Sequence, residues 1–361
     1  MSFEINYSFL DRATHKLAFS VPNIQLIAAD IERSIYASRY KHIEIKNPVF
    51  ITSLPRAGTT LLLEVLNTFS IAATHTYRDM PFVMAPLLFS KAGKQFQKKS
   101  TLKERLHADG VKIGYDSAEA FEEVIWKQFW PKKYRSKTLP LWEETDYYDE
   151  ALEFFFEHMK KIISLRTSTD TKSPQYISKN NANIGRIDFI NNNFDGAKIV
   201  VPIRDPIAQA SSMLNQHKKF LDTHKKNKFA LRYMRDIGHY EFGKLHRPID
   251  FNGDLISTEK DETLSISYWL NYVTKALEHI SKKKDQIIPF YYDDACLHPK
   301  TQLIQLLDRI QLDYSRTELA TAAEMFHQPK AYETEKLDIP QALHEKAYTF
   351  YNNILDIPSP V

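Results

Sequence analysis

Three short apolar runs stand out along this chain, separated by longer stretches in which apolar residues recur with helical spacing. They are Pro48-Val-Phe-Ile-Thr-Ser53, Ala197-Lys-Ile-Val-Val-Pro-Ile203 and Ile287-Ile-Pro-Phe-Tyr-Tyr292. Each run has the length of a strand and few charges, which is typical of a strand buried inside a sheet. We therefore expect three core strands at these positions.

The stretches beside these runs predict helices. Thr59 to Phe69 carries leucines at 61, 62, 63 and 66, as expected of a helix packed on a sheet. The second run is preceded by a predicted helix over 182–193 and followed by Pro206, which suits the first turn of a helix. Further helices are expected near 300–310 and 315–327. Strands that alternate with helices indicate an α/β fold with a central parallel sheet flanked by helices.

Residues 1–361 are expected to form one domain. Residues 1–46 look helical and polar. The stretches 75–170 and 215–260 hold few strand signals and many aromatic residues. We therefore expect large helical insertions there, which form a substrate pocket beside the sheet.

Composition narrows the class of protein. Hydrophobic residues make up 43% of the chain and charged residues 26%, as in an ordinary folded protein. Only 9 glycines are present, which favours a helix-rich fold over one built on glycine-rich turns. The 48 basic and 45 acidic residues nearly balance, so the charge gives no reason to expect nucleic-acid binding.

Little in the sequence points to export or to a membrane. The single cysteine, Cys296, cannot form a disulfide framework. Residues 1–10 lack the basic start and apolar core of a signal peptide. No apolar run reaches the ~20 residues that cross a bilayer. We expect a cytoplasmic protein without stable membrane insertion.

The turn Leu54-Pro-Arg-Ala-Gly58, between the first strand and its helix, predicts an anion site. Such a turn directs backbone N–H groups and the positive end of the helix dipole at one point. Gly58 permits close approach of the backbone, Thr59 and Thr60 add hydroxyl donors, and Arg56 adds a planar cation. The lysine and leading glycine of G-x-x-x-x-G-K-[ST] are missing, which argues against ATP or GTP. The alternative is a turn that only joins a strand to a helix.

A second group follows the strand at 197–203. Arg204 emerges at the carboxyl end of that strand, where ligands of open α/β sheets bind. Ser212 lies about two helical turns further on and can face the same way. An arginine with a hydroxyl suits an additional phosphate, although an ordinary helix cap at Arg204-Asp-Pro206 would look the same.

The two groups together resemble the motifs of sulfotransferases that use 3′-phosphoadenosine-5′-phosphosulfate (PAPS). Pro55-Arg-Ala-Gly-Thr-Thr60 resembles their 5′-phosphosulfate loop, most closely that of the broad bacterial and tyrosylprotein-type branch. Val201-Pro-Ile-Arg-Asp-Pro206, continued to Ser212, resembles their 3′-phosphate motif. Ser178-Lys-Asn180 and Tyr292-Asp-Asp294 are similar to segments that accompany these motifs.

The resemblance implies a P-loop-like fold, PAPS as the donor, adenosine 3′,5′-bisphosphate as the product, and no metal requirement. The cofactor-binding residues that it implies are Arg56, Ala57, Gly58, Thr59, Thr60, Arg204 and Ser212. The chain shows no clear counterpart of the glycine-rich adenine-side motif of the cytosolic branch, so the adenine contacts stay unassigned.

Sulfuryl transfer needs an in-line geometry and stabilisation of charge on the transferred group. Arg56 is expected to supply that charge. Lys179 is a second candidate catalytic cation, on the leaving phosphate, although a solvated surface lysine would also fit.

A hydroxyl acceptor also needs a base. Asp79, 21 residues after Gly58, is the first candidate because related branches carry an acidic base after this helix. An ion pair with Arg78 or another cation is its alternative role. His107 is the second candidate, or else a structural histidine. Glu119 and Glu123 are outside choices that would otherwise serve helix-terminus electrostatics.

Histidines also occur at Asn215-Gln-His217 and in Gly238-His-Tyr-Glu-Phe-Gly243. The second segment places His239 and Glu241 between two glycines, which is unusual in a chain with few glycines, and makes it a candidate lining of the acceptor pocket. The spacing does not match a helical zinc site.

Two other functions remain open at this point: a P-loop kinase of a small metabolite, and a nucleotide-binding protein of the same fold without turnover. The acceptor of a sulfotransferase is likewise open between a small molecule such as a phenol, a carbohydrate, a lipid headgroup and a peptide. The sequence is silent on the oligomeric state.

Overall fold

The computed structural model describes residues 9–21, 23–89, 103–104, 112–113, 118, 120–251, 262–327 and 338–355. A five-stranded sheet lies at its centre, in the order β2-β6-β1-β7-β9. All four pairings between these strands are parallel. The strands are β1 (Val49–Ile51), β2 (Ala72–Ala73), β6 (Gln175–Lys179), β7 (Lys198–Ile203) and β9 (Ile288–Tyr291).

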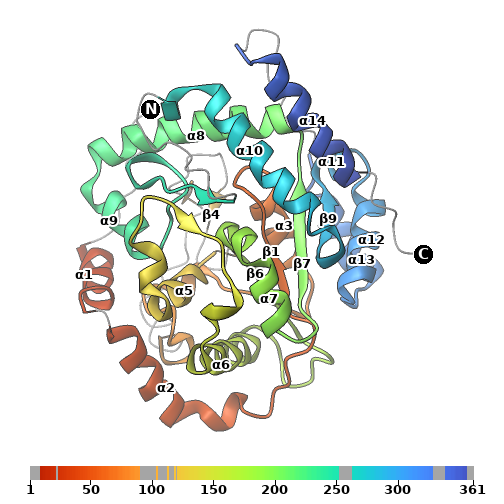
Figure 1. The fold of residues 1–361 in the computed structure, drawn as a ribbon. Helices are drawn as coiled ribbons and strands as arrows, with labels where there is room; N and C mark the ends of the chain where they lie inside the picture. Colours follow the sequence, from red (N-terminus) through yellow and green to blue (C-terminus); the bar gives the residue numbers. More distant parts are fainter. Residues whose placement is uncertain are drawn as a thin grey trace.

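Helices cover both faces of the sheet because the side chains of each strand alternate between them. Val49 and Ile51 face one apolar cluster, whereas Phe50 faces the other. The first cluster packs under α3 (Thr59–Leu66), α11 (Tyr292–Leu297), α12 (Pro299–Ile310) and α13 (Arg316–Ala323). The other face packs under α6 (Asp149–Arg166), α7 (Ile187–Asn193), α8 (Pro206–Lys226), α10 (Ile266–Ser281) and α14 (Gln341–Leu355). Figure 1 shows the strands between these two groups of helices. The predicted α/β fold is confirmed.

The N-terminal helices α1 (Phe9–Ala18) and α2 (Ile24–Tyr40) run along the outer edge of the molecule (Figure 1). A buried ion pair fixes α2 to α6, with Lys161 Nζ 3.2 Å from a carboxylate oxygen of Glu32. Of the stretch 1–46, the described residues are helical over Phe9–Ala18 and Ile24–Tyr40.

The two long stretches that the sequence predicts as helical are only partly so. The first contains α5 (Glu123–Phe129) and α6, together with short 3-10 turns and the strand β5 (Leu139–Pro140). The second contains the end of α8, then α9 (Lys228–Asp236), a 3-10 turn at Gly243–Leu245 and β8 (Ile249–Asp250). Strand β5 pairs in parallel with β8. The two stretches therefore meet beside the sheet. The two-stranded β3 (Lys103–Glu104) and β4 (Lys112–Ile113) also belong to the first stretch.

Candidate active site

The turn after β1 lies close against the start of α11. Arg56 and Gly58 both have positive φ, at 71° and 98°. A Cβ atom at Gly58 would lie 2.2 Å from Cδ2 of Tyr292, the first residue of α11. Only glycine fits, because any side chain here would collide with that ring and would also sit in the left-handed region.

Within the described part of the chain, several N–H groups of this turn have no backbone acceptor. Among the described residues, no backbone carbonyl accepts a hydrogen bond from Ala57 or Gly58. The first-turn N–H groups of α3, at Thr59 and Thr60, have no intrahelical acceptor either. These donors, together with the helix dipole, form a cradle that fits a phosphate or sulfonate group.

Residues of α8 and the residue Arg204 just before it hold this loop in place. Arg56 Nε donates to Ser212 Oγ at 3.0 Å, and Arg204 Nη1 donates to the carbonyl of Arg56 at 2.9 Å. Gln209 Nε2 donates to the carbonyls of Leu54 and Pro55 at 3.1 Å each. The two motifs that lie about 150 residues apart in the sequence are therefore in direct contact.

Arg204 is buried at the carboxyl end of β7, with its guanidinium 5.2 Å from the ring centroid of Tyr292. The helix after it begins with the side chain of Asp205 accepting from the N–H of Ala208 at 2.8 Å, and with Pro206 in the first turn. This cap fixes the direction in which α8 leaves the sheet, and hence the place of Ser212.

Strand β6 delivers a third set of polar groups to the same sheet edge. It ends at Lys179, which is buried and lines a cavity beside the loop. Two residues later, Asn181 Oδ1 accepts from Thr59 Oγ1 at 3.1 Å, and Asn181 Nδ2 donates to Glu241. Asn181 thus connects the cradle to the segment at 238–243.

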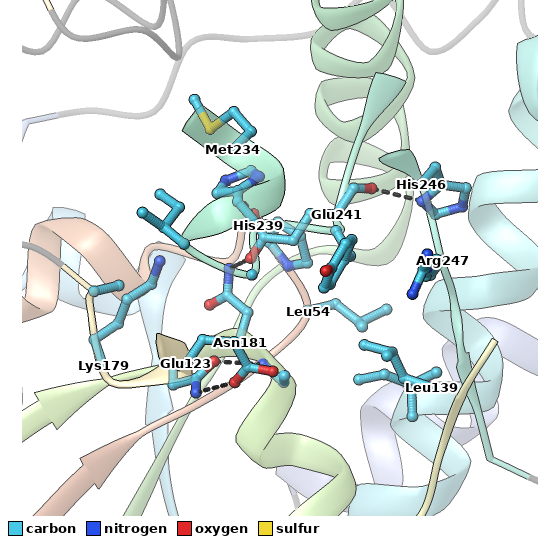
Figure 2. A pocket seen from close by; sticks show the side chains of 18 of the residues that line it. Leu54, Glu123, Leu139, Lys179, Asn181, Met234, His239, Glu241, His246 and Arg247 are labelled. Atoms are coloured by element: carbon cyan, nitrogen blue, oxygen red, sulfur yellow. Dashed lines mark hydrogen bonds and ion pairs between the residues drawn. The ribbon is translucent and has the colours of Figure 1, made fainter. Parts of the chain in front are cut away.

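The cavity has a volume of about 950 Å³, part of which is open to solvent. Its walls are mainly apolar and aromatic and include Leu54, Tyr77, Phe121, Tyr233, Met234 and Ile249. Figure 2 shows Lys179, Asn181, His239 and Glu241 together on one side and His246 with Arg247 on another. Walls of this chemistry suit a small, largely apolar molecule with a few polar groups.

The carboxylate of Glu241 stays ionised in this cavity. Burial opposes ionisation, but the neighbouring His239 and Lys179 and the hydrogen bond from Asn181 lower the pKa of Glu241 to about 2. His239 Nε2 lies 2.9 Å from Glu241 Oε2. His246 contacts the backbone carbonyl of Glu241 and the hydroxyl of Tyr268, and burial lowers its pKa to about 3, so that this histidine is neutral.

Asp79, the first predicted base, does not line the cavity. Its carboxylate contacts the ring of His75, the N–H of Thr76 and the guanidinium of Arg166, and 1% of the residue is exposed. Burial would raise the pKa of Asp79, but His75 and Arg166 outweigh it and the pKa is lowered. These contacts favour a structural role for Asp79, because every one of them would be lost in reaching an acceptor.

The other predicted bases stand as follows. His107 and Glu119 lie outside the described residues. Glu123 lines the cavity, but its carboxylate is held by Arg186 at 2.8 and 2.9 Å and by Asn180 and Tyr134 at 2.6 Å each. These hydrogen bonds hold the carboxylate of Glu123 in a buried network at the cavity wall, which favours a structural role for it.

His217 does not line the cavity. It is buried on α8, its Nδ1 accepts from the N–H of Gly243 at 3.2 Å, and burial lowers its pKa to about 4. Within the described part of the chain, no group of three His, Cys, Asp or Glu side chains could hold a metal ion.

Comparison with known proteins decides the family. The model of the sulfotransferase family matches residues 48–247, which include both motifs and the cavity-lining segment. This chain belongs to the sulfotransferase family. Members of this family use PAPS as the sulfuryl donor, as the family assignment implies for this sulfotransferase.

The fold is similar to that of sulfotransferase STF9 from Mycobacterium avium, with a TM-score of 0.54 and 13% identity, over 99% of this chain and 88% of that one. Sulfotransferase STF1 from Mycobacterium tuberculosis H37Rv is also similar, with a TM-score of 0.48 and 11% identity, over 96% of this chain and 88% of that one. No curated protein sequence matches this chain. None of the helices in the described part combines the length and apolar composition that a membrane crossing requires.

Several residues of this sulfotransferase site were not singled out from the sequence. Asn181 and Arg247 become visible only in the fold, since each acts through a neighbour that is remote in sequence. Tyr292 was noted in the sequence as part of a family segment, but its contact with the Gly58 turn is seen only in the fold. The strand β6 was not predicted, because its polar ends, Gln175 and Lys179, interrupt the apolar pattern of a buried strand. The whole strand is nevertheless buried. Its place between β1 and β2 is what brings Lys179 to the loop.

Proposed function

We propose that this sulfotransferase binds PAPS across the two contacting motifs and transfers its sulfuryl group to a hydroxyl or amine acceptor in the adjoining cavity. The observation that carries this proposal is the contact of Arg56 with Ser212 and of Arg204 with the loop carbonyl. Those contacts bring the cradle for the 5′-phosphosulfate next to the groups suited to the 3′-phosphate.

The loop would act on the charge of the donor. The N–H groups of Ala57 and Gly58 and the hydroxyl of Thr60 would donate to the 5′-phosphosulfate, and Arg56 would supply the positive charge. Lys179 lies at the border between loop and cavity, where an ammonium group can neutralise the leaving phosphate. Each aimed donor of this kind lowers the barrier by about 3–4 kcal/mol.

The acceptor in this proposal is a small molecule, or the end of a carbohydrate or lipid, that presents its hydroxyl or amine to the loop. The walls of the cavity support a largely apolar acceptor, because aromatic rings and aliphatic side chains make up most of them. The transfer itself follows an in-line path, in which the acceptor oxygen attacks sulfur from the side opposite the leaving phosphate.

Calorimetric titration tests the donor site. Adenosine 3′,5′-bisphosphate should bind with micromolar affinity, independently of magnesium, and more tightly than ATP. Arg204→Ala should weaken binding at least tenfold, whereas Arg316→Ala, which removes an exposed arginine at the start of α13, should not. Magnesium-dependent binding of ATP in place of the bisphosphate would overturn this proposal in favour of a kinase.

A further inference from the structure

Two lysine or arginine side chains of the described residues line the cavity, and they lie apart from each other. Lys179 borders the donor loop, and the proposed transfer uses it. Arg247 lies just before β8, and the proposed function gives it no role. Figure 2 shows the two side chains on opposite sides of the view. The cavity therefore has a second cation away from the reacting end.

The guanidinium of Arg247 is half-buried and is held in place by neutral groups. Its Nη1 donates to the backbone carbonyl of Tyr134, and its Cζ lies 4.5 Å from the ring centroid of Tyr240. Among the described residues, no carboxylate forms an ion pair with it. A charged side chain that is withdrawn from water is usually paired with an opposite charge. Arg247 is therefore suited to pair with an anionic group of a ligand.

The two carboxylates that line the described cavity wall are engaged by other groups. Glu123 Oε2 lies 2.8 Å from Nη1 of Arg186. Glu241 Oε2 lies 2.9 Å from His239 Nε2, and Glu241 Oε1 accepts from Asn181. Because each carboxylate has its own partners, the described wall leaves the charge of Arg247 unbalanced.

A second cation beside Arg247 adds to the positive charge of this wall. Lys127 of α5 lies over the same ring of Tyr240, with Nζ 5.7 Å from its centroid. Burial lowers the pKa of Lys127 to about 8. Asp236 and Glu123 oppose this shift, whereas the positive charge of Arg247 adds to it. An anion bound at Arg247 would therefore be favoured by both cations.

The backbone around Arg247 is fixed on both sides. The N–H of Arg247 donates to the carbonyl of Tyr240 at 2.8 Å. The carbonyl of Pro248 accepts from the first residue of β5 at 2.9 Å, and the N–H of Ile249 donates to the hydroxyl of Tyr272 at 2.9 Å. Since this segment is held without a ligand, little ordering of the chain would oppose binding at the guanidinium.

We propose that Arg247 binds a carboxylate of the acceptor, so that the acceptor is a largely apolar acid with its reacting hydroxyl or amine at the end remote from that carboxylate. This inference rests on the proposed function of the site and adds to it the class of acceptor. A carboxylate is the anion that we infer because its two oxygens match the planar N–H groups of a guanidinium.

The walls of the cavity suit the body of such a molecule. Leu54, Leu139 and Ile249 line the cavity together with Lys179 and Arg247. An aromatic ring or an alkyl chain can cover these apolar side chains, while a few polar groups fix its orientation. Binding of the carboxylate at Arg247 would thus direct the other end of the acceptor toward the donor loop.

The test compares each acid with its own methyl ester, which has the same hydroxyl and the same body but no charge. The pairs are 4-(hydroxymethyl)benzoate and a series of ω-hydroxyalkanoates of increasing length. Release of adenosine 3′,5′-bisphosphate from PAPS measures kcat and KM for each member. For at least one pair, native protein should prefer the acid over the ester by about 10–100-fold in kcat/KM, as expected for a hydrogen bond between two charged groups.

Two variants assign that preference to Arg247. Arg247→Met should lose most of the preference, chiefly through a higher KM for the acid. Arg247→Gln is the milder change, because it keeps an N–H donor for the carbonyl of Tyr134, and it should lose the preference as well. Arg135→Met, at an exposed arginine beside Tyr134, is the matched control and should keep the native preference.

The ratio of acid to ester separates binding from a merely structural role. A structural role would lower kcat/KM for acid and ester equally and leave their ratio unchanged. An unchanged ratio in Arg247→Gln, or native protein that turns over both members of every pair equally well, would overturn this inference.

Calorimetry separates this inference from the proposed function. Both Arg247 variants should bind adenosine 3′,5′-bisphosphate as native protein does, because Arg247 lies away from the donor loop. Turnover of neutral alcohols without a preference for any acid would overturn the class of acceptor alone. Failure of native protein to bind the bisphosphate would instead overturn the proposed function and this inference with it.

Discussion

The donor side and the acceptor side of the proposed site differ in how many segments of the chain contribute residues to them. The donor side consists of two short segments, 54–60 and 204–212, that follow directly after core strands β1 and β7. The acceptor side gathers side chains from β6, α5, α9 and the turn at 238–247. The donor side relies on backbone N–H groups, whereas the acceptor side relies on side chains held by a buried ionic network.

This difference predicts which kind of substitution should impair each side. Mutation cannot remove the backbone N–H donors of the loop. A larger side chain in the loop, however, would push these donors out of position. A side-chain network is damaged by removing a charge, because the partner left behind is buried without compensation. Substitutions of each type should therefore affect one side and spare the other.

The largest expected effect is on the acceptor side. Arg186→Met would remove the cation that holds Glu123 and that lies between the rings of Trp126 and Trp142, at 4.7 and 4.8 Å. Because it leaves a buried carboxylate unpaired, it should lower the free energy of unfolding by about 3–5 kcal/mol. Urea unfolding followed by circular dichroism measures this change.

Arg33→Met is the matched control for Arg186→Met. It breaks an ion pair with Glu157 in which the arginine side chain is 46% exposed, so that less than about 1 kcal/mol should be lost. Equal losses in the two variants would contradict the importance of the buried network.

Lys179→Met tests the border between the two sides. If this ammonium neutralises the leaving phosphate, kcat/KM should fall by about 10²–10³-fold, which corresponds to the loss of one aimed donor. Lys172→Met, at an exposed lysine a few residues before β6, should keep full activity. Steady-state kinetics with any alcohol that the enzyme accepts measures kcat/KM for both variants. A decrease of less than about threefold for Lys179→Met would show that Lys179 has no role in the mechanism.

Gly58→Ala should damage the donor side alone. The added methyl would collide with the ring of Tyr292, and the left-handed φ would cost about 1–2 kcal/mol by itself. We expect donor affinity to fall at least tenfold. Gly58→Ala with Tyr292→Ala should recover part of the affinity, because the collision is relieved while the backbone strain persists. No recovery in the double variant would show that the ring is not the obstacle.

The smallest expected effect is the pH dependence of stability that comes from two buried histidines near the acceptor side. Burial lowers the pKa of His217 and His224 to about 4, below the ~6.5 of an unfolded chain. Between these values the unfolded state binds more protons, so stability is full above pH ~6.5 and falls as the pH drops toward 4. From pH 7.5 to 5.5, each histidine should cost about 1 kcal/mol in the free energy of unfolding.

Urea unfolding at the two pH values measures this loss for the native protein and for the double variant His217→Asn with His224→Asn. The double variant should show a flatter pH dependence, because it lacks both titrating rings. The same slope in both proteins would assign the acid sensitivity to other groups.

The same difference between the two sides explains how far the sequence could be interpreted. The donor side is local: an apolar strand, a turn with Arg56 and Gly58, and a helix follow one another, so spacing alone predicts their arrangement. The contact of Arg56 with Ser212 could be expected only in outline, from the rule that the carboxyl ends of parallel strands share an edge.

The acceptor side could not be predicted in the same way. Asp79 has the spacing of a base, but its environment depends on His75 and on Arg166 at the end of α6, which sequence spacing does not reveal. Conversely, the flanking glycines drew attention to His239 and Glu241, whereas the contact of Glu241 with Asn181 depends on where β6 lies in the sheet. The two stretches predicted as helical contain short strands because β5 and β8 find each other across about 110 residues.

The central claim is that one donor nucleotide spans both motifs, and a cycle of two ligands and two proteins tests it most directly. Calorimetry would compare adenosine 3′,5′-bisphosphate with adenosine 5′-monophosphate on the native protein and on Arg204→Ala. Native protein should prefer the bisphosphate by at least tenfold, and Arg204→Ala should lose that preference while binding the monophosphate almost unchanged. A variant that loses affinity equally for both nucleotides would contradict the assignment of Arg204 to the 3′-phosphate.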